Sequence, residues 1–140
     1  MSFFDALSSS ASALTAQRLR MDVISNNLAN AESTKTKDGH PYRREMVEFE
    51  SRDAMRRDLQ GRLTRVPAGV KVAKIVEDQS PFRQVYDPGN PSANPDGYVQ
   101  MPNVNTIQEM TDMISATRSY EANVTVINAV KGMAGKALEI

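Results

Sequence analysis

The side chains able to do chemistry in this sequence of 140 residues are few and stand apart from one another. His40 is the only histidine and lies in a Gly-His-Pro turn, and cysteine is absent. A lone histidine has no second metal ligand at a usable spacing, and a chain without cysteine forms no disulfide, thiolate metal site or cysteine nucleophile. We therefore expect His40 to be an exposed turn residue, and we predict neither a metal nor a cofactor.

Two further groups are explained better by local structure than by chemistry. Asp87 and Asp96 flank a loop rich in glycine and proline, but their spacing does not match a calcium-binding loop, and aspartate is common in turns. A group of serines lies in an Ala/Ser stretch without the glycines of a nucleophile elbow, so we interpret it as small residues that permit close helix packing. These are Ser8, Ser9, Ser10 and Ser12. Because no catalytic constellation remains, we predict that the chain is not an enzyme.

A cluster of arginines is the remaining candidate for ligand binding, because guanidinium groups can contact phosphates. Interleaved acids cancel most of its charge, no aromatic stacking platform accompanies it, and the whole chain has a formal net charge of zero. We expect a solvated face or a protein interface here, and no nucleic acid as partner. The arginines are Arg43, Arg44, Arg52, Arg56, Arg57, Arg62 and Arg65, and the acids are Glu45, Glu48, Glu50, Asp53 and Asp58.

The distribution of proline divides the chain into three segments. All seven prolines lie between Pro41 and Pro102, so the two ends are free to form long helices and the middle is not. We predict an N-terminal helix in residues 1–34, a β-rich middle segment in residues 35–102 and a C-terminal helix in residues 103–140. Within the middle segment, β-forming residues predict strands at 42–49, 70–76 and 82–86. The charged stretch 50–65 is expected to be an exposed loop or a short solvated helix.

Apolar residues in the N-terminal segment recur every seven positions, which predicts a helix from about Phe4 to Asn30. The repeat consists of Leu7, Leu14, Met21 and Leu28. Leu19 and Val23 lie off this stripe, so the helix is apolar on more than one side.

The C-terminal segment predicts a second helix, from Asn105 to Leu138. Asn105 is a suitable N-cap, and Glu109 and Asp112 lie where the helix dipole favours acids. The apolar stripe comprises Met110, Met113, Thr117, Tyr120, Val124, Ile127, Ala134 and Leu138, and it is widened by Ile107, Ile114, Val126 and Val130. Gly132 and Gly135 weaken the helix near its end. Two helices with this much apolar surface need several neighbours, which favours association with other chains.

Residues 16–34, AQRLRMDVISNNLANAEST, closely resemble the N-terminal signature of bacterial flagellar basal-body rod proteins. The core of that signature is a Ser/Asn-Asn-Leu-Ala-Asn-x-x-Thr pattern. Residues 80–91, SPFRQVYDPGNP, and 109–124, EMTDMISATRSYEANV, look like the FlgC type of this family rather than the FlgB, FlgF or FlgG types. The resemblance covers most of the chain in the right order, but the charged stretch 50–65 has no counterpart that we can place.

The resemblance implies a mainly α fold with a small β part, in which the long terminal helices of one subunit pair as a coiled coil. It implies a structural subunit of the proximal rod, which polymerises through its terminal helices into the axial tube that spans the periplasm, transmits torque and forms part of the export channel. The implied partners are other copies of the chain, other rod proteins and the flagellar type III export apparatus. Export would proceed in an unfolded state and without a cleaved signal peptide.

The N-terminus agrees with that route, because it lacks the basic region and long apolar stretch of a cleaved signal peptide. No apolar run approaches the ~20 residues of a membrane span, so we expect no insertion into a membrane. An alternative from another class is a coiled-coil adaptor or export-associated binding module. Such an adaptor needs only one apolar stripe, whereas both terminal helices here are apolar on more than one side.

On this resemblance we expect a set of helical residues to form the contacts between subunits. The asparagines among them also suit simple helix termination, and Tyr120 also suits core packing within the subunit. The expected interface residues are Leu14, Met21, Asn26, Asn27, Leu28, Asn30, Met113, Tyr120, Asn123, Val124 and Ile127.

Overall fold

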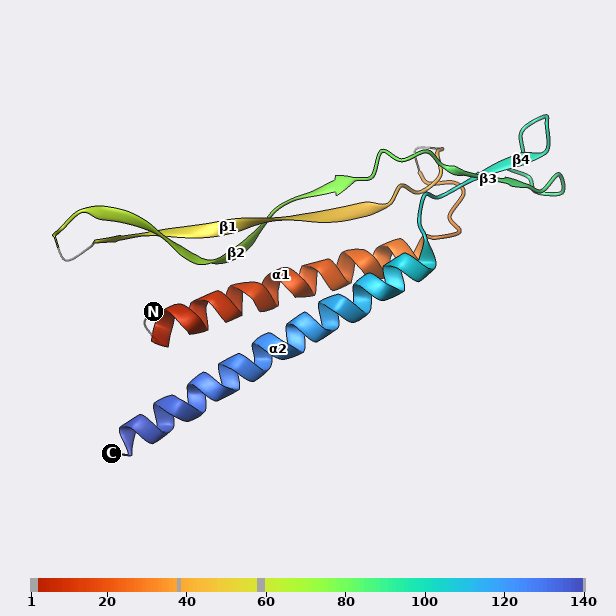
Figure 1. The fold of residues 1–140 in the computed structure, drawn as a ribbon. Helices are drawn as coiled ribbons and strands as arrows, with labels where there is room; N and C mark the ends of the chain where they lie inside the picture. Colours follow the sequence, from red (N-terminus) through yellow and green to blue (C-terminus); the bar gives the residue numbers. More distant parts are fainter. Residues whose placement is uncertain (1–2, 38, 58–59, 140) are drawn as a thin grey trace.

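The computed structural model describes residues 3–37, 39–57 and 60–139, with the backbone alone at Arg56 (Figure 1). Asp58 and the side chain of Arg56, both part of the charged stretch, therefore lie outside the described residues. The elements in chain order are α1 (Phe3–Ala29), β1 (Glu45–Arg57), β2 (Leu63–Glu77), β3 (Arg83–Tyr86), β4 (Tyr98–Met101) and α2 (Thr106–Leu138). The predicted fold class, two long terminal helices in contact and a small β middle, is confirmed.

The molecule is elongated, and α1 lies between α2 on one side and a long hairpin on the other (Figure 1). The two helices run antiparallel along each other, so the two ends of the chain lie at the same end of the molecule. The hairpin is made of β1 and β2, paired antiparallel. A second, short hairpin of β3 and β4 projects from the opposite end, where α1 ends and α2 begins.

Both helices follow the sequence prediction closely. The side chain of Asn105 accepts hydrogen bonds from the backbone N–H groups of Ile107 and Gln108, which confirms it as the N-cap of α2. The helix continues through Gly132 and Gly135 to its end at Leu138. The two glycines therefore cost helix propensity without ending the helix.

The charged stretch 50–65 was predicted to be an exposed loop or a short helix, and that prediction is wrong for residues 50–57 and 63–65, which lie in strands. Residues 50–57 complete β1 and residues 63–65 begin β2. Opposite charges face each other across the two strands, where Lys71 approaches Glu50 at 3.1 Å and Lys74 approaches Glu48 at 3.4 Å. Cross-strand pairs of this kind stabilise the hairpin. They cannot be predicted from the sequence of either strand alone.

The serines of α1 allow the hairpin to pack close to the helix. Gly69 of β2 has a φ of +123°, and a Cβ there would lie 2.2 Å from Ser12 Oγ. The Ser12 hydroxyl accepts a hydrogen bond of 3.1 Å from the backbone N–H of Val70. Close packing is therefore present at Ser12, but the element that approaches it is a strand and not the predicted helix.

The core is thin, and much of the chain remains in solvent. The accessible surface is 10042 Å², whereas a compact monomer of this mass exposes about 7200 Å². The buried apolar residues are mostly small and lie along the line of contact between the elements, namely Ala16, Val23, Ile24, Ala31, Val99, Val104, Ala116 and Val130. The fold thus leaves apolar surface that its own elements do not cover.

Candidate functional site

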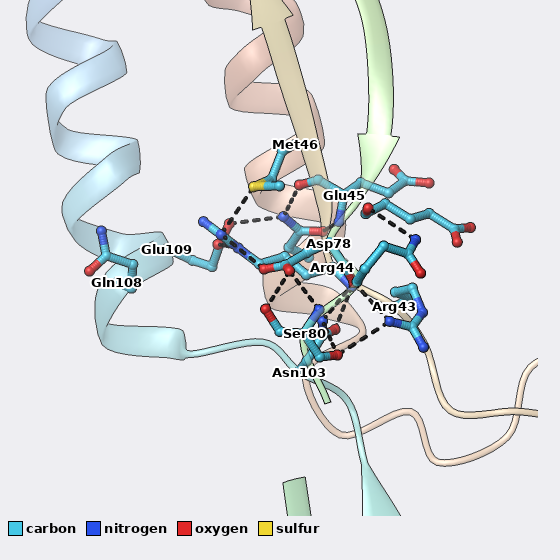
Figure 2. A network of polar contacts seen from close by, with 12 residues as sticks. Arg43, Arg44, Glu45, Met46, Asp78, Ser80, Asn103, Gln108 and Glu109 are labelled. Atoms are coloured by element: carbon cyan, nitrogen blue, oxygen red, sulfur yellow. Dashed lines mark hydrogen bonds and ion pairs between the residues drawn. The ribbon is translucent and has the colours of Figure 1, made fainter. Parts of the chain in front are cut away.

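A buried ion pair joins the start of α2 to the residue that precedes β1 (Figure 2). Glu109, in the first turn of α2, is 0 % exposed, and its Oε1 lies 2.5 Å from Arg44 Nε. An isolated buried carboxylate is costly, so this charge is tolerated only because it is paired and hydrogen-bonded. The sequence prediction gave Glu109 only a favourable interaction with the helix dipole.

Asn27 of α1 binds the same carboxylate, and we call the cluster of Asn27, Arg44 and Glu109 the junction. Its Nδ2 donates to the other oxygen of Glu109, Oε2, at 3.0 Å and to the backbone oxygen of Glu45 at 2.8 Å. Its Oδ1 accepts from the backbone N–H of Glu45 and from the Tyr42 hydroxyl, each at 2.9 Å. One carboxamide, itself 1 % exposed, therefore fixes α1, α2 and the entry to β1 relative to one another.

Further charges surround Arg44 at the edge of the junction. Asp78 and Asp112 lie 3.6 Å and 3.5 Å from its terminal nitrogens. Asn103 accepts from the backbone N–H of Arg44 at 2.8 Å and donates to the backbone oxygen of Asp78 at 3.0 Å (Figure 2). The segments after β2 and before α2 are thus tied to the same arginine.

The protein environment shifts the pKa values of three side chains at or near the junction. Burial alone lowers the pKa of Arg44, but the hydrogen bond and charge of Glu109 outweigh burial and raise that pKa above its ordinary value. Burial, and next the charge of Glu45, raises the pKa of Tyr42 to about 12. Hydrogen bonds from the side chain and backbone of Ser80 lower the pKa of Asp78. At neutral pH Arg44 is therefore charged and Tyr42 is neutral. Neither group changes its protonation near neutral pH, which suits a structural role.

The expected interface residues lie along the helix pair and at the junction. Asn27 is buried with its bonds inside the subunit, so it can act on neighbouring chains only through the position of α1. Asn26 is exposed and donates to the Tyr42 hydroxyl at 3.2 Å. The other nine are half-buried: Leu14, Met21, Leu28, Asn30, Met113, Tyr120, Asn123, Val124 and Ile127. Across the pair, the Met21 sulfur lies 3.6 Å from the Thr117 hydroxyl.

The most exposed large apolar side chains of the first half of α2 lie outside that expected set. Ile107, Met110 and Ile114 are 76, 57 and 55 % exposed. The sequence prediction noted them as apolar surface on α2 without assigning them to an interface. Their spacing of three and four residues is the signal that could have found them.

The residues first considered for chemistry lie apart in the structure. His40 is exposed in a turn, as predicted. Asp87 and Asp96 lie in the loop between β3 and β4, where the backbone oxygen of Asp87 accepts from the N–H of Asn90. Among the described residues, no group of three His, Cys, Asp or Glu side chains is placed to hold a metal ion.

Arg43, one of the clustered arginines, packs its guanidinium 4.5 Å from the centre of the Phe82 ring.

The described helices also differ from membrane-spanning helices. Within the part of the chain that the structure describes, no helix is both long enough and apolar enough to cross a bilayer.

An elongated chain with two paired terminal helices, a buried structural junction and uncovered apolar faces defines a structural subunit. Family models support this class at both ends: residues 7–35 match "Flagella basal body rod protein" and residues 96–140 match "Flagellar basal body rod FlgEFG protein C-terminal". The chain belongs to the flagellar basal-body rod protein family of the FlgC type, which is structural and not enzymatic.

Individual relatives cover nearly the whole chain. It is 53 % identical to flagellar basal-body rod protein FlgC of Bacillus subtilis, over 100 % of this chain and 99 % of the relative. It is 45 % identical to the FlgC protein of Borreliella burgdorferi, over 100 % and 98 %. The FlgC protein of Salmonella typhimurium is 47 % identical, over 92 % of this chain and 90 % of its own length. This coverage includes the middle segment, which the two family models leave largely unmatched.

Proposed function

We propose that this rod subunit polymerises through α1 and α2 into the proximal part of the axial tube, and that the hairpins form its outer part. The single observation that carries the proposal is the apolar surface left on the helices of a chain that belongs to a rod family. Large contiguous apolar patches on a protein surface mark association surfaces. The partners are other copies of the chain and other rod proteins.

The half-buried residues along the helix pair contribute their remaining surface to these contacts, and the junction residues hold the helices at a fixed angle. Leu14, Met21 and Leu28 supply apolar surface from α1, and Val124 and Ile127 supply it from α2. Apolar surface on more than one side of each helix supports a polymer, because an adaptor needs only one stripe. A closely packed tube also favours subunits whose net charge is zero.

The chain reaches the rod, in this proposal, through the flagellar type III export apparatus, unfolded and without removal of an N-terminal leader. The tube then lies in the periplasm and transmits torque. Its thin core agrees with this route, because a chain that buries little surface alone unfolds at small cost and gains stability on assembly.

The test is to purify basal bodies from a strain whose own copy of the gene is deleted and replaced by a tagged copy. We expect the tagged chain to be present in the rod fraction with its original N-terminal residues, as read by mass spectrometry. A chain found in the cytoplasm and missing from basal bodies would refute the rod assignment. A shortened N-terminus would refute the export route alone.

A further inference from the structure

An apolar stripe on α2 lies largely in solvent. Its members, Ile107, Met110 and Ile114, follow the spacing of one helix face and are each more than half exposed. Ala116, two positions beyond Ile114, is 0 % exposed. A step of two residues turns about 160° around a helix, so the stripe points away from the buried side of α2.

A groove opens between α1 and β2 on the other flank of the molecule. Its volume of about 680 Å³ has room for about 20 water molecules. Its apolar lining consists of Ala16, Leu19, Val70 and Val72, and its charged rim consists of Arg18, Asp22, Arg52 and Lys71. Leu19 is two positions from Met21, which contacts α2, so Leu19 faces away from α2 by the same helical geometry.

The area that the whole chain leaves exposed is large enough for contact with another chain. The accessible surface of 10042 Å² exceeds that of a compact monomer by about 2800 Å². A stable protein interface buries a total of about 1,200–2,000 Å². The excess is therefore large enough for at least one complete interface per subunit.

The positions of the stripe and the groove allow a second copy to be the occupant. The two surfaces face opposite ways on one chain, so they can meet only between different copies. A contact that joins two different faces repeats from copy to copy and builds a ring or a helical filament. Beyond the stripe, Arg118 and Glu121 continue on the same face of α2, and the groove rim offers both signs of charge to meet them.

We propose that the stripe Ile107–Met110–Ile114 of one copy docks into the groove between α1 and β2 of the next copy. This proposal rests on the proposed function, and it names the two surfaces through which the copies polymerise. It places α2 of one subunit beside α1 of its neighbour, so that helix pairs lie side by side around the tube.

Disulfide trapping in assembled basal bodies tests the contact, and the absence of natural cysteines makes the result unambiguous. The test chain carries Leu19→Cys together with Ile114→Cys, and a second test chain carries Leu19→Cys together with Met110→Cys. The matched control carries Leu19→Cys together with Leu138→Cys, because Leu138 is an exposed apolar residue of the same helix outside the stripe. Each single variant is prepared as well, and incorporation is measured in the same samples under reducing conditions.

We expect at least one test chain to form disulfide-linked dimers and longer ladders after mild oxidation. The single variants and the Leu138 control should stay at least tenfold less cross-linked. Incorporated test chains that both remain monomeric would overturn the proposed contact and leave the rod assignment standing. Adducts with a protein of another mass would show that a different rod protein fills the groove, which would also overturn it.

Discussion

Asn27 and Glu109, 82 positions apart in the sequence, share a buried hydrogen bond of 3.0 Å between the carboxamide nitrogen and Oε2. Neither side chain is more than 1 % exposed. Arg44 binds the other oxygen of the same carboxylate, so residues from all three segments of the chain meet at one point. The buried carboxylate of Glu109 is thus held by a cation from the middle segment and an amide from α1.

Replacement of Glu109 by Ala should lower the free energy of unfolding by about 3 kcal/mol, because it leaves the Arg44 guanidinium without its closest partner. Urea unfolding followed by circular dichroism measures this change. The control is the double variant Arg44→Met/Glu109→Leu, which removes both charges. Its loss should be smaller than the sum of the losses of Arg44→Met and Glu109→Leu measured singly, and strict additivity would contradict the pairing.

Replacement of Asn27 by Ala should cost about 1–3 kcal/mol, because the backbone N–H of Glu45 and the Tyr42 hydroxyl both lose their acceptor. The matched control is Asn30→Ala. The Asn30 side chain donates to Asn26 and accepts from the Ser33 hydroxyl, both within four residues, and its loss should cost less than about 1 kcal/mol. Equal losses in the two variants, measured by the same unfolding experiment, would show that the carboxamide of Asn27 has no special role.

Gly69→Ala should destabilise the packing of the hairpin on α1 more than Gly61→Ala does. Both glycines have positive φ, of +123° and +75°, so both substitutions strain the backbone. Only at Gly69 does the added carbon also meet Ser12. Thermal unfolding should show the lower melting temperature for Gly69→Ala, and equal values would mean that the close approach contributes nothing.

Acid should weaken the junction through Asp78, whose pKa is lowered in the folded chain. A lowered pKa contributes stability that is fully present above the ordinary aspartate value, about 3.9. That contribution is lost as the pH falls through the folded value. In unfolding free energies measured from pH 6 downwards, this contribution should stay constant to about pH 4 and be lost at lower pH. Asp78→Asn should make the unfolding free energy less dependent on pH in this acid range. The same pH dependence in the variant would contradict the lowered pKa of Asp78.

The sequence was sufficient for the helices because their signals are local. The seven-residue repeat of Leu7 and Leu14 and the N-cap at Asn105 depend only on neighbours in the chain, and the structure has both helices where these signals place them. The strands predicted at 42–49 and 70–76 were too short, because the pairing of Glu50 with Lys71 exists only across two strands. Periodicity within one strand does not contain that information.

The junction was missed for a related reason. An acid in the first turn of a helix, such as Glu109, is explained by the helix dipole alone, and nothing in the local sequence indicates its burial. Asn27 likewise suits the end of a helix. Only the meeting of segments 82 residues apart shows that these two residues are joined. The close approach of Gly69 to the helix was also missed, since its neighbour Ser12 comes from α1.

The central claim, assembly through the terminal helices, is tested most directly by incorporation of Leu28→Asp and Val124→Asp into basal bodies. Ser92→Asp, in the exposed loop between β3 and β4, is the control, and circular dichroism of each purified variant checks that helix content is retained. We predict that the two helix variants are made but are depleted at least tenfold from purified basal bodies, because each would bury an unpaired charge between subunits. The control should incorporate normally. Normal incorporation and motility with both helix variants would contradict the account.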